Sequence, residues 1–263
     1  MNMILIKIAK AFIVAFSMYS KIPMPRFKWD SDDMKYHFCF FPFIGAVIGV
    51  LEFAWLKAFI NFQFDRILFN LFAVAIPVLT TGGIHLDGFI DTMDALHSYQ
   101  DREKKLEILK DPHVGAFGII CLAMYFVITI GFLFAATKFI AYICICFSFI
   151  ISRALSGISV CVFKKAKSQG MAFSSGMNLN RNIVVTVLAL ETAAAIGAMF
   201  YLCNGNFLFP TVTVSVIGLV FLYYCFMIRK NFGGITGDLA GFLVCSAESA
   251  VVVSSGIVCI LLG

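Results

Sequence analysis

Three aspartates in one short polar stretch have the side chains best suited to chemistry. The stretch runs from Thr81 to Asp94 (TGGIHLDGFIDTMD) and holds Asp87, Asp91 and Asp94 at positions i, i+4 and i+7. On a helix these side chains point to about 0°, 40° and −20°, which is a single narrow stripe. Stacked carboxylates repel one another and lose hydration unless a divalent cation lies among them. Oxygen ligands of this kind favour Mg²⁺ or Mn²⁺, and the alternative is a solvated amphipathic helix at a membrane edge.

The residues just before the stripe could bring the chain close to a ligand. Gly82 and Gly83 allow the backbone to turn and to approach a bound group, although a plain turn uses the same residues. His85 could bind the metal or a phosphate, or it could hydrogen-bond one of the carboxylates. We therefore take Gly82, Gly83 and His85 as candidate contacts to a substrate phosphate.

A second polar loop, KDPHVGAFG, runs from Lys110 to Gly118. Asp111 in this loop is a candidate for a further metal ligand or for the group that activates a hydroxyl. The alternative is a helix cap or turn former before Pro112. Acidic and basic residues alternate just upstream, which is typical of a solvated helix with salt bridges.

A third polar loop, GGITGD, runs from Gly233 to Asp238 and precedes the last apolar run. Consecutive glycines at a helix start expose backbone N–H groups to an anion. Gly233, Gly234, Thr236 and Gly237 are therefore candidate phosphate contacts. Asp238 either caps the helix or adds a carboxylate to the metal site.

Arg153 is a cation inside an apolar run, where an unpaired charge is costly and usually functional. We expect it to pair with a phosphate or with one of the site carboxylates. Acids also occur inside the apolar runs at Glu52, Glu191 and Glu248. Glu248 follows the glycine loop in the last run, so it is the one placed to support the site.

The elements that hold these residues are membrane spans. Of 263 residues, 61% are apolar and 13% are charged, and the mean hydropathy is +0.94. A soluble domain carries roughly a quarter charged residues. This composition excludes a soluble enzyme, a nucleic-acid-binding module and a disordered linker. Most of the nine cysteines lie in apolar runs without a CxxC pair, so we interpret them as small buried side chains.

Seven apolar runs are long enough to cross a bilayer, and together they predict one all-α, polytopic membrane domain over residues 1–263. The first twenty residues are amphipathic at helical spacing, so they either lie in the plane of the membrane or form a further span. The predicted spans cover 38–60, 66–82, 115–136, 138–163, 182–203, 207–228 and 239–263.

Positive charge collects on one side of these spans. The segments 21–37, 83–114, 164–181 and 229–238 hold 14 of the 20 Lys and Arg residues. The positive-inside rule therefore places these segments, and with them all three polar loops, in the cytoplasm. The predicted location is the cytoplasmic membrane of a bacterium or archaeon, with the site facing the cytoplasm.

A carboxylate-bound metal beside glycine loops and basic residues suits a substrate that contains a pyrophosphate. The metal would neutralise the phosphoryl oxygens and the leaving group, which is most of what such catalysis requires. No nucleophilic Ser or Cys motif is evident, so we expect direct in-line attack by a substrate hydroxyl that an aspartate activates. The residues alone predict a membrane phosphotransferase acting on a nucleotide-linked substrate.

The chain resembles the cobalamin synthase family, the adenosylcobinamide-GDP ribazoletransferases. The most specific match is the TGG-hydrophobic-HLDG block followed by two further aspartates. The matching stretches lie in order along nearly the whole chain: FSMYSKIPMPR (Phe16–Arg26), FPFIGAVIG (Phe41–Gly49), TGGIHLDGFIDTMD (Thr81–Asp94), DPHVGAFG (Asp111–Gly118), Ser152-Arg153 and GGITGD (Gly233–Asp238).

The resemblance implies a reaction in which α-ribazole, or its 5′-phosphate, attacks the cobinamide-side phosphate of adenosylcobinamide-GDP. GMP leaves, and adenosylcobalamin or its 5′-phosphate forms in a Mg²⁺-dependent step. The reaction would take place at the lipid bilayer without a nucleic-acid partner, and the protein could act as a monomer or as a homo-oligomer. Carried over to this chain, the Mg²⁺ ligands would be Asp87, Asp91, Asp94 and Asp238. Asp111 would join them or activate the ribose hydroxyl, while Arg153 and the Gly233–Gly237 loop would hold phosphates.

The sequence departs from the family pattern at two places. Ala95 stands where Gly is common, and Pro112-His113 stands where Ser-Arg is common. His113 or Lys110 would then take over a phosphate contact of the missing Arg. The alternatives are a CDP-alcohol phosphotransferase, whose two closely spaced Asp before Gly and following Ala-Arg are absent here, and a transporter or ion channel, which would place its charges near the bilayer midplane.

Overall fold

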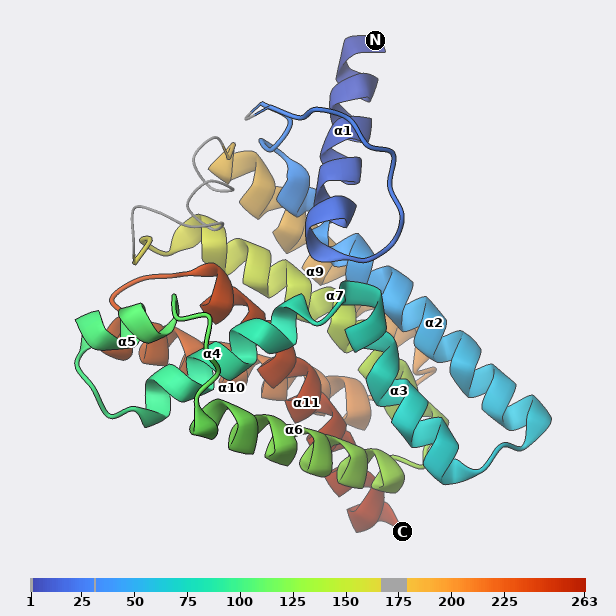
Figure 1. The fold of residues 1–263 in the computed structure, drawn as a ribbon. Coiled ribbons are helices and arrows are strands. Elements are labelled where there is room, and N and C mark those ends of the chain that lie inside the picture. Colours follow the sequence, from blue (N-terminus) through green and yellow to red (C-terminus); the bar gives the residue numbers. More distant parts are fainter. Residues whose placement is uncertain (1, 31, 167–178) are drawn as a thin grey trace.

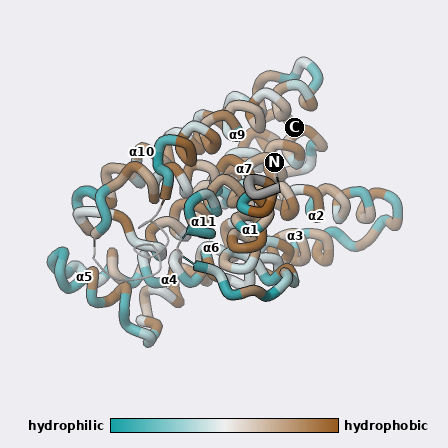
Figure 2. Tube along the Cα trace, turned by 90° about the horizontal axis from the view of Figure 1, so that it is seen from above, coloured by the Kyte–Doolittle hydropathy of each residue, from teal (hydrophilic) through white to brown (hydrophobic). Residues whose placement is uncertain are grey.

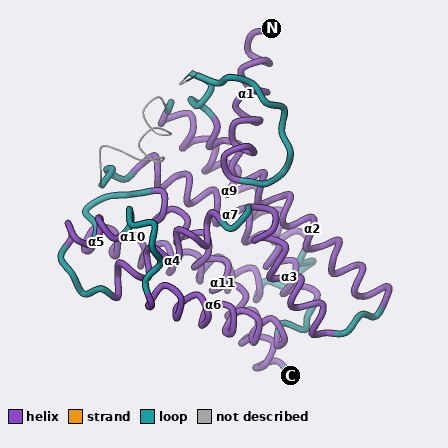
Figure 3. The backbone as a smooth tube through the Cα atoms, viewed as in Figure 1, coloured by secondary structure: helices purple, strands orange, loops and turns teal. Residues whose placement is uncertain are grey.

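The computed structural model describes residues 2–30, 32–166 and 179–263, and regular structure in these ranges is helical (Figure 1; Figure 3). A single parallel bridge joins Lys165 to Ile235. The elements are α1 (Asn2–Tyr19), η1 (His37–Phe40), α2 (Phe41–Phe62), α3 (Arg66–Thr81), α4 (Ile84–His97), α5 (Arg102–Ile108), α6 (Ala116–Ala135), α7 (Phe139–Val162), α9 (Arg181–Leu202), α10 (Leu208–Asn231) and α11 (Gly237–Leu262).

Six of the described helices are long and apolar enough to cross a membrane, which confirms the predicted polytopic helical protein. They are α2 with η1, α6, α7, α9, α10 and α11. Each lies within a few residues of a predicted span. The predicted span 66–82 corresponds to α3, which alone is shorter than the others and is followed by α4 after a bend of 97°. The helix α1 is not among the six, and its predicted position in the plane of the membrane stays a prediction.

The bend between α3 and α4 follows from the double glycine. Gly82 has φ 67° and Gly83 has φ 79°, both in the left-handed region that side chains disfavour. The N–H groups of both glycines donate to the carbonyl of Val78 and close the end of α3. The chain therefore turns within two residues and starts α4 in a new direction, with the aspartate stripe on it. The plain-turn interpretation of Gly82 and Gly83 thus accounts for their conformation.

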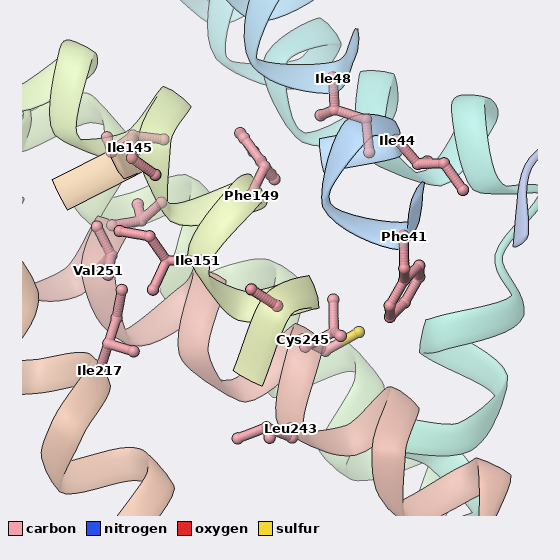
Figure 4. Packing of buried hydrophobic residues seen from close by; sticks show 14 of the residues in the cluster. Phe41, Ile44, Ile48, Ile145, Phe149, Ile151, Ile217, Leu243, Cys245 and Val251 are labelled. Atoms are coloured by element: carbon pink, nitrogen blue, oxygen red, sulfur yellow. The ribbon is translucent and has the colours of Figure 1, made fainter. Parts of the chain in front are cut away.

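The core is built around α7, which packs against α2, α9, α10 and α11. Figure 4 shows the packing of buried side chains from three helices in this core. They are Phe41, Ile44 and Ile48 of α2, Ile145, Phe149 and Ile151 of α7, and Leu243, Cys245 and Val251 of α11. A Cβ on Gly45 would overlap the carbonyl of Phe149, so the backbones of α2 and α7 touch at this point. All nine cysteines are free thiols, and seven of them are buried, as expected for small apolar side chains.

The predicted positively charged segments meet at one end of the bundle. The amide of Asn180 donates to Lys35 O, Arg102 donates to Arg229 O, and Ala166 donates to Ile235 O. The opposite end holds the α2–α3 and α6–α7 connections, which Arg66 joins by donating to Phe134 O. Hydrophilic colour gathers at α5 and at connecting segments, while hydrophobic colour runs along the long helices (Figure 2). The charged end is therefore one continuous face.

Candidate active site

The helices α4 and α11 touch backbone to backbone beside the aspartate stripe. A Cβ on Gly88 would lie 2.6 Å from the carbonyl oxygen of Asp238 and 2.8 Å from its Cα. A Cβ on Gly241 would lie 3.1 Å from the carbonyl oxygen of His85. Because both contact points are glycines, the start of α11 settles directly onto α4. This packing brings Asp238 to the three aspartates of α4.

Asp87, Asp91, Asp94 and Asp238 form the carboxylate cluster. Asp91 is half-buried, and its pKa is raised to about 7 by burial first and then by the negative charges of Asp87, Asp238 and Asp94. All four residues predicted as metal ligands therefore lie within electrostatic reach of one another. The sequence predicted the stripe on α4, and the fold adds Asp238 from 147 positions beyond Asp91 along the chain.

Helix N-termini provide part of the compensation for this negative charge. Asp87 lies in the first turn of α4 and Asp238 in the first turn of α11. The Oδ1 atom of Asp94 accepts a hydrogen bond of 3.2 Å from the amide of Gly118, in the first turn of α6. A Cβ on Gly115 would overlap the Asp94 carboxylate, so this glycine allows α6 to start there. Three helices thus begin at the cluster, and their N-terminal N–H groups favour anions.

Side-chain cations do not balance the α4 carboxylates. Among the ion pairs of residues 2–30, 32–166 and 179–263, none includes Asp87, Asp91 or Asp94. Among the described side chains, no three His, Cys, Asp or Glu residues are arranged to hold a metal ion by themselves. Mg²⁺ usually takes one or two carboxylates and completes its shell with waters and substrate phosphates. An open set of clustered carboxylates fits that mode of binding, because it leaves coordination positions for a substrate.

Two pockets adjoin the cluster, and Asp87 lines both. The enclosed pocket has a volume of about 150 Å³ and lies between Tyr19, Phe38, Phe41, Ser156, Asp87 and Asp238. The open pocket has a volume of about 560 Å³ and lies between Ser17, Ser20, Lys21, Gly82, Gly83 and Asp87. A carboxylate between two pockets can interact with two substrates at once.

Lys21 is a site residue that the sequence analysis did not assign. Its amide donates to Thr80 O at 2.8 Å, and its side chain covers Gly82, so the end of α1 is fixed against the α3–α4 bend. The residue is exposed and lines the open pocket beside Asp87. The sequence did offer a sign of this role, because Lys21 is a basic residue two positions before Pro23 in the stretch Phe16–Arg26 that resembles the family. Lys21 therefore places a positive charge at the open pocket.

The GGITGD loop is mainly a packing turn. Gly233 has φ 69° and lies under the guanidinium group of Arg102, and Gly234 packs against the backbone of Lys164. The amides of Gly233 and Ile235 are already bonded to backbone carbonyls at 2.8 Å. These contacts do not support the predicted phosphate binding by Gly233 and Gly234.

The second half of the same loop lies closer to the site. Thr236 caps α11 through a 3.3 Å bond from Leu239 N and donates its hydroxyl hydrogen to Asp238 Oδ2 at 3.3 Å. Gly237 lines the enclosed pocket together with Asp238. The loop therefore positions Asp238, and Gly237 is its glycine at the pocket.

Arg153 and His85 lie beneath the site inside the bundle. Arg153 is 1% exposed and donates from Nη1 to Glu248 Oε1 at 2.6 Å. It was predicted to pair with a phosphate or with a site carboxylate. Its partner in the structure is a carboxylate, but one that lies outside the carboxylate cluster. His85 is buried against Phe41, and its pKa lies well below the usual value because of burial and the nearby charge of Arg153. A neutral histidine cannot supply positive charge to a phosphate. Glu248 holds Arg153 in place inside the bundle.

Lys110, Asp111 and His113 are exposed, and the same loop reaches the Asp94 carboxylate further on, at Gly115. Asp111 accepts from the amide of His113 at 2.9 Å and from its Nδ1 at 2.7 Å. These bonds hold the Asp111 pKa below its usual value. Asp111 is not among the carboxylates that act on Asp91. Ala95, where the family commonly has Gly, is buried on α4.

Comparison with known proteins gives a consistent result. The family described as cobalamin-5-phosphate synthase matches residues 11–256. A protein of Lachnoclostridium phytofermentans named adenosylcobinamide-GDP ribazoletransferase is 39% identical over 255 residues, covering 93% of this chain and 94% of the relative. Proteins with the same name from Clostridium botulinum (strain Alaska E43) and Clostridium perfringens (strain SM101) are 32% and 29% identical, covering 91% and 95% of this chain and 94% and 98% of the relatives. No solved structure gives a significant match.

Proposed function

The chain belongs to the cobalamin-5-phosphate synthase family, and we propose that it joins adenosylcobinamide-GDP to α-ribazole, or to α-ribazole 5′-phosphate. The products are adenosylcobalamin, or its 5′-phosphate, and GMP. The observation that carries the proposal is the carboxylate cluster between two pockets in a chain that matches this family over residues 11–256. Two pockets that share one carboxylate suit a reaction that joins two substrates at one phosphate.

Mg²⁺ is the cofactor of the proposed reaction, with Asp87, Asp91, Asp94 and Asp238 as the residues that would hold it. When bound, it would neutralise charge on the phosphoryl oxygens and on the leaving GMP. The N–H groups at the start of α4, α6 and α11 favour the same negative charge without moving. Lys21 in the open pocket is placed to contact a donor phosphate.

The bond changes need one base and no covalent enzyme intermediate. The ribose hydroxyl oxygen attacks the cobinamide-side phosphorus, and the bond from that phosphorus to the oxygen of GMP breaks. The hydroxyl proton passes to an aspartate of the cluster, which acts as general base. Asp91 lies within electrostatic reach of the other three carboxylates and would take this role when those three hold the metal. We propose the same cytoplasmic orientation as the charge pattern predicts, in the cytoplasmic membrane.

The alternatives have less support. The relatives named above are ribazoletransferases, whereas a CDP-alcohol phosphotransferase or a transporter would belong with differently named relatives. The carboxylate cluster also lies at the charged end of the bundle, where a channel does not need it.

The test uses the protein purified in detergent with adenosylcobinamide-GDP, α-ribazole and Mg²⁺. We expect GMP and the cobamide product to form in equal amounts, and EDTA to stop both. The acceptor is also tested as its 5′-phosphate and with lipid restored. Folded protein that forms no product under any of these conditions would overturn the proposed function and direct the search to CDP-linked donors.

A further inference from the structure

We infer that the enclosed pocket binds the planar heteroaromatic base of the acceptor, with the sugar at its mouth beside Asp87 and Asp238. This inference rests on the proposed function and goes beyond it by assigning a substrate to one of two pockets. The pocket of about 150 Å³ is the smaller and more enclosed of the two, and the acceptor is much the smaller substrate.

The inner wall of the pocket is aromatic. Tyr19 of α1, Phe38 of η1 and Phe41 of α2 are buried, and their ring centroids lie 4.8–6.1 Å apart. The Tyr19 hydroxyl is 3.2 Å from His37 Nε2, and this contact fixes the ring. A rigid wall of aromatic rings favours a flat, weakly polar ring that can stack or pack edge-on.

The burial gradient gives the direction of the bound substrate. Asp87 and Gly237 are exposed, Asp238 is half-buried, and the aromatic wall is buried. The carboxylates therefore stand at the mouth and the rings at the bottom. A nucleoside that inserts its base first leaves its ribose hydroxyls next to Asp87 and Asp238, where the proposed reaction requires them.

The polar groups of the pocket select among bases. The Ser156 hydroxyl donates to Ala240 O at 3.0 Å, so its hydrogen is already used. His85 also lines the pocket, and its buried Nε2 has no hydrogen-bond partner among the described residues, so it can meet one ring nitrogen of a base. The exocyclic polar groups of a purine would need further partners, and burying them without these costs free energy. A benzimidazole-type ring carries fewer polar atoms. The pocket therefore favours a benzimidazole-type base over a purine.

Val160 provides a variant that fills the pocket. Val160 lines the pocket and is buried, so Val160→Phe places a ring where the base would lie, and Val160→Ala widens the same space. Leu122→Phe is the matched control, because Leu122 lines only the open pocket. The thermal midpoint in detergent shows which variants fold, and Val160→Ala keeps the test valid if Val160→Phe does not.

Two readouts separate this inference from the proposed function. The first is the Kd of a fluorescent benzimidazole nucleoside measured without donor, and the second is the KM of each substrate during turnover. We expect Val160→Phe to weaken the nucleoside Kd and raise the acceptor KM at least about tenfold, with the donor KM within about twofold. Val160→Ala should lower the preference for benzimidazole over adenine nucleosides, and Leu122→Phe should leave the acceptor KM unchanged.

Each result has a single meaning. Nucleoside binding that Val160→Phe weakens, in a protein without transferase activity, would remove the proposed function and keep the pocket assignment. Transferase activity with an unchanged acceptor KM in Val160→Phe would overturn the assignment, and so would an unchanged base preference in Val160→Ala if Val160→Phe does not fold. A rise in donor KM alone would place the guanine in the enclosed pocket and would also overturn it.

Discussion

The acidic residues Glu52 and Glu248 in the interior of the bundle have hydrogen-bond or ion-pair partners, whereas those of the carboxylate cluster at its charged end mainly face one another. In the interior, Glu248 accepts hydrogen bonds from Ser152 at 2.8 Å and Arg153 at 2.6 Å, and Glu52 accepts one from Tyr142 at 2.5 Å. At the end, Asp87 and Asp91 have no ion-pair partner among the described residues, although they lie beside further carboxylates.

This difference indicates that the interior acids stabilise the fold and that the acids of the carboxylate cluster are available to a ligand. A buried charge without a partner is costly, so Glu248 and Arg153 must neutralise each other for the helices to pack. The carboxylate cluster keeps its repulsion in the folded protein. A cation that binds only the folded state would relieve this repulsion and stabilise the protein by mass action.

Breaking the interior pair should have the largest effect on stability. Glu248→Gln or Arg153→Met leaves an uncompensated buried charge and should lower the free energy of unfolding by about 3–5 kcal/mol. The double variant Arg153→Met/Glu248→Leu should recover much of the loss, because no charge remains buried. Unfolding in detergent measures all three, and Glu107→Gln, which breaks an exposed pair with Lys104, is the control. Equal losses in the single and double variants would contradict the charge argument.

Removing one cluster carboxylate should spare stability and abolish function. Asp91→Asn keeps the side-chain shape but removes a metal ligand and base, so turnover should fall about 100-fold or more, equivalent to about 2.7 kcal/mol. The thermal midpoint should stay the same or rise, because like charges are separated. Asp32→Asn is the matched control, since Asp32 is an exposed acid that pairs with Lys35 and is not a predicted site residue. Near-normal, EDTA-sensitive turnover of Asp91→Asn would remove Asp91 from the site.

Tyr142 tests the interior region without touching a charge. Tyr142→Phe removes the donor to Glu52 and leaves a buried carboxyl without its hydrogen bond, which should cost about 1–3 kcal/mol of stability. Activity per folded molecule should stay at the wild-type level. A Tyr142→Phe variant with normal stability but altered Mg²⁺ dependence would show that the two regions are coupled.

The sequence was sufficient for the fold and for the stripe on α4, because apolar runs and helical spacing are local patterns. Asp238 was predicted as a metal ligand, but its position beside Asp91 depends on the packing of Gly88 on α11, which no local pattern reveals. The predicted phosphate contacts of Gly233 and Gly234 stay a prediction, because a glycine pair that packs against other segments has the same sequence pattern as one that binds an anion. Arg153 was expected to have a partner because an unpaired charge in an apolar run is costly, but which partner it takes depended on which helix lies opposite.

The smallest expected effect is a pH dependence of stability that only the cluster produces. Because the Asp91 pKa is raised from 3.8 to about 7 in the folded protein, the folded state holds a proton that the unfolded chain releases between these values. Without metal, stability should therefore fall by a few degrees in thermal midpoint as the pH rises through this window. Mg²⁺ should restore the midpoint above pH 7 and have little effect below it, where the proton competes with the metal. Asp91→Asn should flatten both responses, while the Tyr142→Phe variant should keep them. A Mg²⁺ effect of equal size at both ends of the window would mean that the cation binds elsewhere than at Asp91.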